Sequence, residues 1–192
     1  MMKLVTKSAV NAVDVARLKE HLRIDGDDAN ARLGNSLNTA IAVLDGPDGE
    51  LGRALINQTW CQTLPGLPRA GALVELELTP VSSISSVEYL DENGAWVALS
   101  ETSYELMEID GRHYVRAGAW PRGSKSGFSH RITYVAGYGA APEDVPEPIR
   151  HAIILLASHF DEMSSPVVYG ETPVEVPISI NRLLAGYKIL WR

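Results

Sequence analysis

Hydrophobic residues recur at helical spacing in three stretches of the chain. The first stretch follows Asn11, an expected N-cap, and the second follows Asp27 and Asp28. An Asp-Gly-Pro-Asp-Gly turn at residues 45–49 ends the second stretch, and the third lies within residues 141–163. The apolar positions on the three faces are Val15, Leu18 and Leu22; Leu33, Leu37, Ala40, Ile41 and Leu44; and Ile149, Ile153, Leu156 and Phe160. We therefore expect two helices at the start of the chain and one deeply buried helix near its end.

Between the second and third helical stretches, apolar and polar positions alternate as they do in half-buried strands. Runs of this kind occupy residues 54–64, 72–80 and 130–139. Two further pairs of runs are joined by Asn93-Gly94 and by Asp110-Gly111, sequences typical of two-residue hairpin turns. The pattern predicts about six short strands in a small antiparallel sheet or barrel.

The order of these elements predicts an α+β fold, a small helical bundle with an inserted antiparallel β-module. Residues 1–52 supply the N-terminal helices of the helical core, residues 53–140 the β-module and residues 141–164 the core helix. Residues 165–192 read as an extended, proline-containing arm followed by a C-terminal helix.

The C-terminal segment is strongly apolar, whereas chain ends are usually polar and frayed. Its large apolar side chains are Ile180, Leu183, Leu184, Tyr187, Leu190 and Trp191. Most of them follow helical spacing, which gives a short helix with one apolar face. Because a helix of about a dozen residues is not stable alone in water, this one must dock. It docks either on the chain's own core or, from the end of the arm, on another molecule.

Composition limits the classes of function. The 192 residues carry a formal net charge of −7 and no basic run, which argues against a sequence-specific DNA-binding protein or a membrane-surface protein. Cys61 is the only cysteine, so we expect neither a disulfide framework nor a cysteine-based zinc site. The start of the chain has no long apolar run typical of a signal peptide, and we expect the protein to be made inside the cell.

The sequence contains no recognisable catalytic motif, so we expect neither an enzyme nor a bound cofactor. His151 and His159 share the third helix, but eight residues separate them, which is about 12 Å along a helix axis. A shared metal ion would need histidines about one turn apart. The glycine-containing loop around Lys125 matches neither a nucleophile elbow nor a P-loop.

Two other functions stay open on these residues. One is a small hydrolase that uses His151 or His159. The other is a β-rich module that binds a carbohydrate or peptide on Trp96, Tyr104 or Trp120, although aromatic residues in strands more often fill a core.

Five carboxylates give the expected β-module an acidic character, namely Glu75, Glu77, Glu88, Asp91 and Glu92. They form either a solvated face or a surface that repels nucleic acid passing close by.

Five segments give the chain a resemblance to a known family. They are VARLKEHLRIDGDDANARL near the start, GRALINQTW before the sheet, LTPVSSISSVEYLDENG in the middle, ITYVAGYG followed by VPEPIRHAIILLASHF, and VPISINRLLAGYK near the end. In this order the chain resembles the head–tail connector, or adaptor, proteins of tailed bacteriophages and phage-like gene transfer agents. It departs from them at LDGPDGELG, where relatives tend to continue as helix, and after Tyr187.

The resemblance implies a structural role in the neck of a virion or phage-like particle. Such adaptors form a ring, expected here to be a dodecamer, under the portal protein. The ring extends the DNA channel and joins the head to a tail-side stopper or tail terminator protein, and DNA passes without specific binding. Carried over, the predicted portal-contact residues are Ile180, Leu183, Leu184, Tyr187, Leu190 and Trp191.

Overall fold

The computed structural model describes residues 1–122, 128–163 and 178–189, and it divides the chain into two units. The β-rich unit consists of residues 1–9 and 57–140, and the helical unit consists of residues 10–56 and 141–192. The α+β class predicted from the sequence is confirmed. The predicted arm at residues 165–177 lies outside the described residues.

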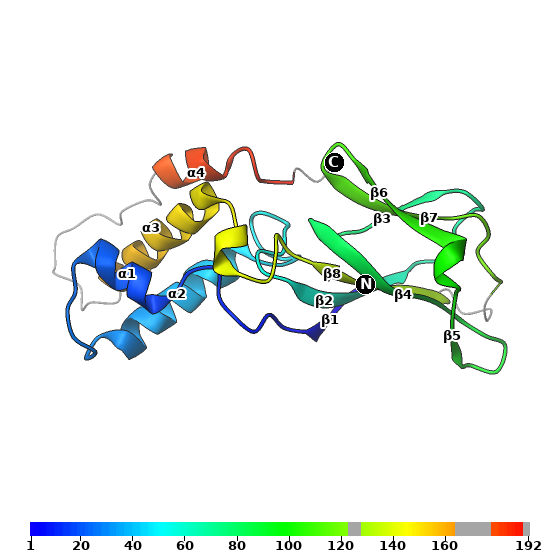
Figure 1. The fold of residues 1–192 in the computed structure, drawn as a ribbon, viewed down its shortest axis with the longest axis horizontal. Helices are drawn as coiled ribbons and strands as arrows, with labels where there is room; N and C mark the ends of the chain where they lie inside the picture. The colour runs from blue at the N-terminus through cyan, green and yellow to red at the C-terminus, as the bar shows by residue number, and fades with distance from the viewer. Residues whose placement is uncertain (123–127, 164–177, 190–192) are drawn as a thin grey trace. The chain divides into compact units, whose positions relative to one another are not determined.

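The β-rich unit contains two antiparallel sheets (Figure 1). The five-stranded sheet has the order β1 (Met2–Thr6), β2 (Gln58–Leu64), β8 (His130–Ala136), β4 (Val81–Leu90) and β5 (Trp96–Ala98). The three-stranded sheet has the order β3 (Leu73–Glu75), β7 (Arg112–Ala117) and β6 (Tyr104–Ile109), and a short 3-10 helix, Glu101–Ser103, precedes β6. Strand β1 was not predicted from the sequence, because most of its side chains are exposed and show no alternation of buried and exposed positions.

The core of the β-rich unit lies on one face of the five-stranded sheet. Alternate residues of β2 and β8 are buried, as the period of a strand requires. Polar groups tie this face to the chain that follows β3: the Leu78 amide donates to the Tyr134 hydroxyl over 3.2 Å, and the Glu77 amide donates to Gln62 Oε1 over 3.0 Å. Burial raises the pKa of Tyr134 well above its usual value, so its hydroxyl stays protonated.

Both predicted hairpins are confirmed, although only the second closes with a two-residue turn. Strands β4 and β5 are joined through Asn93-Gly94, and Gly94 has a φ of 82°. Strands β6 and β7 are joined through Asp110-Gly111, with φ angles of 51° and 73°. Two consecutive positive φ angles are the requirement of a type I′ turn, which explains the Asp-Gly pair.

The helical unit contains α1 (Val15–Leu22), α2 (Asn30–Leu44), α3 (Glu147–Met163) and α4 (Ile178–Leu184), and a 3-10 helix, Pro142–Asp144, precedes α3. Helix α3 packs against the other three. The core side chains buried most fully include Leu18, Leu33, Leu37, Leu44, Ile149 and Ile153, all of which the helical spacing placed on apolar faces. Within the described ranges, no helix is long and apolar enough to cross a membrane.

The N-cap of α1 differs from the prediction. Asp14, not Asn11, caps the helix, because its Oδ1 accepts a hydrogen bond from the Arg17 amide over 2.8 Å. Asn11 instead donates its side-chain amide to Asn38 Oδ1 on α2 over 3.2 Å.

Candidate partner-binding site

The C-terminal helix places part of the predicted contact set in the chain's own core. Helix α4 packs on α3, and the side chains of Ile180 and Leu184 are 3% and 0% exposed. The sequence left open whether the helix docks on the chain's own core or on another molecule. Ile180 and Leu184 dock on the chain's own core. Their burial removes apolar area from water at about 25 cal/mol per Å², which accounts for the stability of so short a helix.

The residues after α4 are held by the loop that follows α2. The Tyr187 carbonyl accepts a hydrogen bond from Arg53 Nε over 2.6 Å, and the Ile189 amide donates to the Leu51 carbonyl over 3.1 Å. Lys188 Nζ lies 3.0 Å from Glu50 Oε2. Residues 187–189 are thus anchored through their main chain as well as by a charge pair. The spacing of hydrophobic residues could not predict these three contacts, because two of them use main-chain atoms of residues 187–189.

The remaining predicted contact residues divide into two groups. Leu183 and Tyr187 are half-buried and keep part of their surface open to a partner. Leu190 and Trp191 lie outside the described residues. A portal contact through the end of the chain stays a prediction, and its candidates on the described surface are Leu183 and Tyr187.

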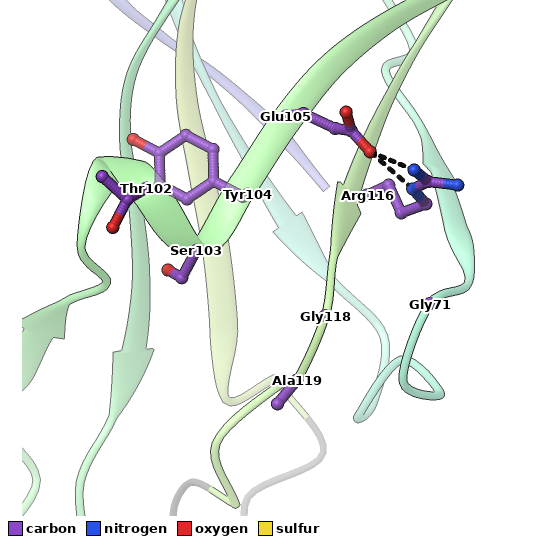
Figure 2. A pocket seen from close by; sticks show the side chains of 8 residues that line it. All are labelled: Gly71, Thr102, Ser103, Tyr104, Glu105, Arg116, Gly118 and Ala119. Carbon is purple, nitrogen blue, oxygen red and sulfur yellow. Dashed lines mark hydrogen bonds and ion pairs between the residues drawn. The ribbon is translucent and has the colours of Figure 1, made fainter.

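The β-rich unit contains a pocket of about 680 Å³ that the sequence did not predict (Figure 2). It is lined by Gly71, Thr102, Ser103, Tyr104, Glu105, Arg116, Gly118 and Ala119. Glu105 and Arg116 stand opposite each other on β6 and β7, and Arg116 Nε donates to Glu105 Oε1 over 2.6 Å. Burial, and then the nearby charge of Glu101, raise the pKa of Tyr104 above its usual value.

The chemistry of the pocket does not favour catalysis. Ser103 Oγ donates to the Ser100 carbonyl over 2.5 Å, so this hydroxyl closes a turn. The pocket lining contains no histidine or cysteine to act as a base or nucleophile. Its two charged groups are paired with each other, which leaves little net charge to attract an ionic ligand.

The histidines proposed for a hydrolase and the tryptophans proposed for a carbohydrate- or peptide-binding module do not gather into one site. The His151 ring lies 6.2 Å from that of His21, and His159 lies beside Phe160. Across the described part of the chain, no group of three or more His, Cys, Asp or Glu side chains is arranged to hold a metal ion. Trp120 is buried beside His130, and the Arg131 guanidinium lies 4.2 Å from the ring centre of Trp96.

The negative charge is distributed differently from the expectation. Glu75 and Glu88, two of the five carboxylates assigned to an acidic β-module, pair with Arg112 and Arg131 at 2.5 and 2.8 Å. The β-rich unit carries 8 Lys and Arg against 9 Asp and Glu, a net charge of −1. The helical unit carries 9 against 15, a net charge of −6. The acidic excess therefore belongs to the helical unit.

The fold of both units recurs in chains of gene transfer agent (GTA) particles. The chain matches one in a neck of an empty GTA particle computed with C6 symmetry, with a TM-score of 0.80. It matches chains in a virion of a native GTA particle and in a native neck computed with C12 symmetry, with TM-scores of 0.79 and 0.77.

Each match has 23% sequence identity and covers 100% of this chain and 97% of the other. No protein-family model matches the chain, and no curated protein matches its sequence. At this identity the likeness establishes the fold, which is the fold that the resemblance to head–tail connectors implied.

Proposed function

We propose that the protein is a structural head–tail adaptor in the neck of a phage-like particle. In this role it forms a ring under the portal protein, extends the DNA channel and presents a platform to a tail-side stopper or tail terminator protein. The observation that carries the proposal is the match of both units, over the full chain, to neck chains of GTA particles.

Two further observations support this role over an enzymatic one. The pocket lining contains no nucleophile paired with a base, and its polar side chains form an ion pair and a turn hydrogen bond. The similar necks have C6 and C12 symmetry, which is compatible with a ring of twelve copies.

The portal contact is assigned to the outer part of the C-terminal segment. Ile180 and Leu184 hold α4 on the helical core, and residues 187–189 are anchored to the loop that follows α2. Leu183, Tyr187, Leu190 and Trp191 are then the residues that contact the portal, with the aromatic pair as the main anchors.

The test uses heads that carry a portal but lack this protein. Purified full-length protein is added, unbound protein is removed by sedimentation, and the neck is imaged by electron microscopy. The wild type is expected to co-sediment and to add a ring below the portal. If it does not attach to the portal, or attaches elsewhere on the particle, the adaptor role is wrong.

Two variants test the portal-contact residues separately from the adaptor role. Leu190→Ala combined with Trp191→Ala is expected to remain folded and to stay in the supernatant. Leu67→Ala removes an exposed apolar side chain from the β-rich unit and is the matched control that should still attach. Attachment of the double variant at wild-type level would disprove the portal contact but leave the adaptor role standing.

A further inference from the structure

The five-stranded sheet has an open edge at each end. Strand β1 is one edge strand and β5 is the other. Lys3, Leu4 and Val5 on β1 are exposed, as are Trp96, Val97 and Ala98 on β5. An open edge presents main-chain N–H and C=O groups that can pair with a strand of another molecule. The two edges are therefore potential contacts between copies of the chain.

The hydrogen-bond pattern shows which main-chain groups face outward at each edge. Met1 and Thr63 form a hydrogen-bonded pair, in which each main-chain N–H donates to the other residue's carbonyl. Hydrogen-bonded and non-hydrogen-bonded pairs alternate along an antiparallel ladder, so the main-chain N–H and C=O groups of Met2 and Leu4 face away from β2. On β5 the Asp91 amide donates to Ala95 and the Leu99 amide donates to Val87. By the same alternation, the outward-facing residues of β5 are those at 96 and 98.

The side chains at the two edges point to defined faces of the sheet. Leu4 stands opposite buried Trp60, which places it on the core face. Val97 stands opposite Tyr89, which pairs with fully buried His130, so Val97 is on the core face too. Leu4 is 40% exposed and Val97 is 36% exposed. Each edge thus ends in a core-face apolar residue with no neighbouring strand to cover it.

The faces determine how the two edges can join. In an antiparallel joint, residues whose main-chain groups face outward stand directly opposite each other. Leu4, whose side chain is on the core face, would then stand opposite Trp96, whose side chain is on the other face of the sheet. In a parallel joint, an outward-facing residue stands opposite an inward-facing one and bonds to both of its neighbours. Leu4 then stands opposite Val97 and bonds to the main chain at 96 and 98. Only the parallel joint keeps both core faces on the same side.

Strand directions lead to the same joint. Each of the four steps from β1 to β5 is antiparallel, so β1 and β5 run in the same direction. A second copy in the same orientation therefore presents its β1 parallel to β5 of the first. A head-to-tail contact of this kind repeats from copy to copy and closes into a ring when the rotation allows it.

Charge also matches across the joint. Residues 1–10 contain Lys3 and Lys7 and no acidic residue, whereas residues 90–110 contain six acidic residues and no basic one. With Leu4 opposite Val97, the three residues of β5 meet the middle of β1. Lys7 follows β1 and Glu101 lies beyond β5 at the same end of the joint, and both are exposed. A shift by two residues would place Met2 there instead, and Met2 is less exposed than Leu4, so that register would cover less apolar surface.

We infer that neighbouring copies join by parallel pairing of β5 of one copy with β1 of the next, with Leu4 opposite Val97. The inference rests on the proposed ring and adds the surface that builds it. The joint forms about three main-chain hydrogen bonds per interface and covers the two apolar edge residues.

The test is a disulfide between copies. Cys61→Ser removes the single cysteine, and Leu4→Cys with Val97→Cys places one thiol at each edge. Directly opposed residues on neighbouring strands lie about 4.8 Å apart, within the range of about 4.4–6.8 Å between the Cα atoms of a disulfide. The full-length variant is assembled on portal-bearing heads, sedimented and oxidised, and its products are separated by denaturing gel electrophoresis.

The expected result is a ladder of covalent oligomers that reaches the copy number of the ring. Either single-cysteine variant should stay monomeric. The matched control, Leu4→Cys with Ala98→Cys, places the thiols on opposite faces and should give little ladder. A ring seen by microscopy without a ladder overturns the edge pairing and leaves the proposed function intact. Dimers from Leu4→Cys alone overturn it in favour of β1 pairing with β1. Absence of any ring refutes both proposals.

Discussion

Leu184→Ala should destabilise the helical unit, because the side chain is 0% exposed where α4 packs on α3. Removing a fully buried leucine side chain costs about 2–5 kcal/mol, the lost transfer free energy plus the cavity left behind. We expect about 3 kcal/mol, because a terminal helix can shift to fill part of the space. With a urea m-value of about 2 kcal/mol per M, the unfolding midpoint should fall by about 1.5 M.

The assay is urea unfolding of the full chain followed by far-UV circular dichroism at a helical wavelength. Arg182→Ala is the matched control, because Arg182 is exposed on the same helix and should change the unfolding free energy by less than about 0.5 kcal/mol. If Leu184→Ala unfolds at the same urea concentration as the wild type, α4 does not contribute to the core, and the whole helix is free to serve as a partner contact.

Three further outcomes are expected. The Arg131 guanidinium, through its hydrogen bonds to the Glu88 carboxylate, holds the pKa of Glu88 below the ordinary value of 4.5. The stability from this pair is therefore complete above pH 4.5 and is lost as the pH falls through the lower folded-state pKa, so Glu88→Gln should flatten the acid side of a thermal-unfolding profile. Lys7→Glu should weaken ring assembly about fivefold and Glu101→Lys in the same chain should restore it, as measured by mass photometry; no rescue would argue against their contact. Full-length protein should leave double-stranded DNA unshifted at about 50 mM salt, and submicromolar binding would contradict a channel that releases DNA.

Local turn and helix signals predicted most of the interior of the fold. Gly94 in the first hairpin and Asp110-Gly111 in the second adopt φ angles that few other residues adopt, so these turns depend little on tertiary contacts. The apolar stripes of α2 and α3 are equally local, because 3.6-residue spacing identifies the buried face directly.

The errors fall where neighbouring elements decide the structure. Strand β1 lies at an edge with most of its side chains exposed, so it lacks the alternation that marks a half-buried strand. Strand β3 ends at Glu75 although the apolar alternation continues. Beyond it the Leu76 amide still donates to the His113 carbonyl of β7 over 2.8 Å, and the Gln62 side chain bonds the main chain of Glu75 and Glu77 on the side that faces away from β7. Neither pairing can be inferred from a single segment of sequence.

The candidate site shows the same limit. Helical spacing correctly marked Ile180 and Leu184 as apolar positions on one face, but spacing does not identify the surface that covers that face. The anchors of residues 187–189 involve Leu51 and Arg53, which are far away in sequence and meet the chain end only in the folded unit.

The division of charge between the units gives the acidic composition a physical consequence. A carboxylate repels phosphates only where no guanidinium neutralises it, and screening confines the effect to about 10 Å from the surface. In the β-rich unit Arg112 and Arg131 neutralise two of the carboxylates that the sequence assigned to repulsion. The helical unit keeps a net charge of −6. In the proposed ring, the helical unit is therefore the part suited to face passing DNA, and the nearly neutral β-rich unit, with one basic and one acidic edge, is suited to join neighbouring copies.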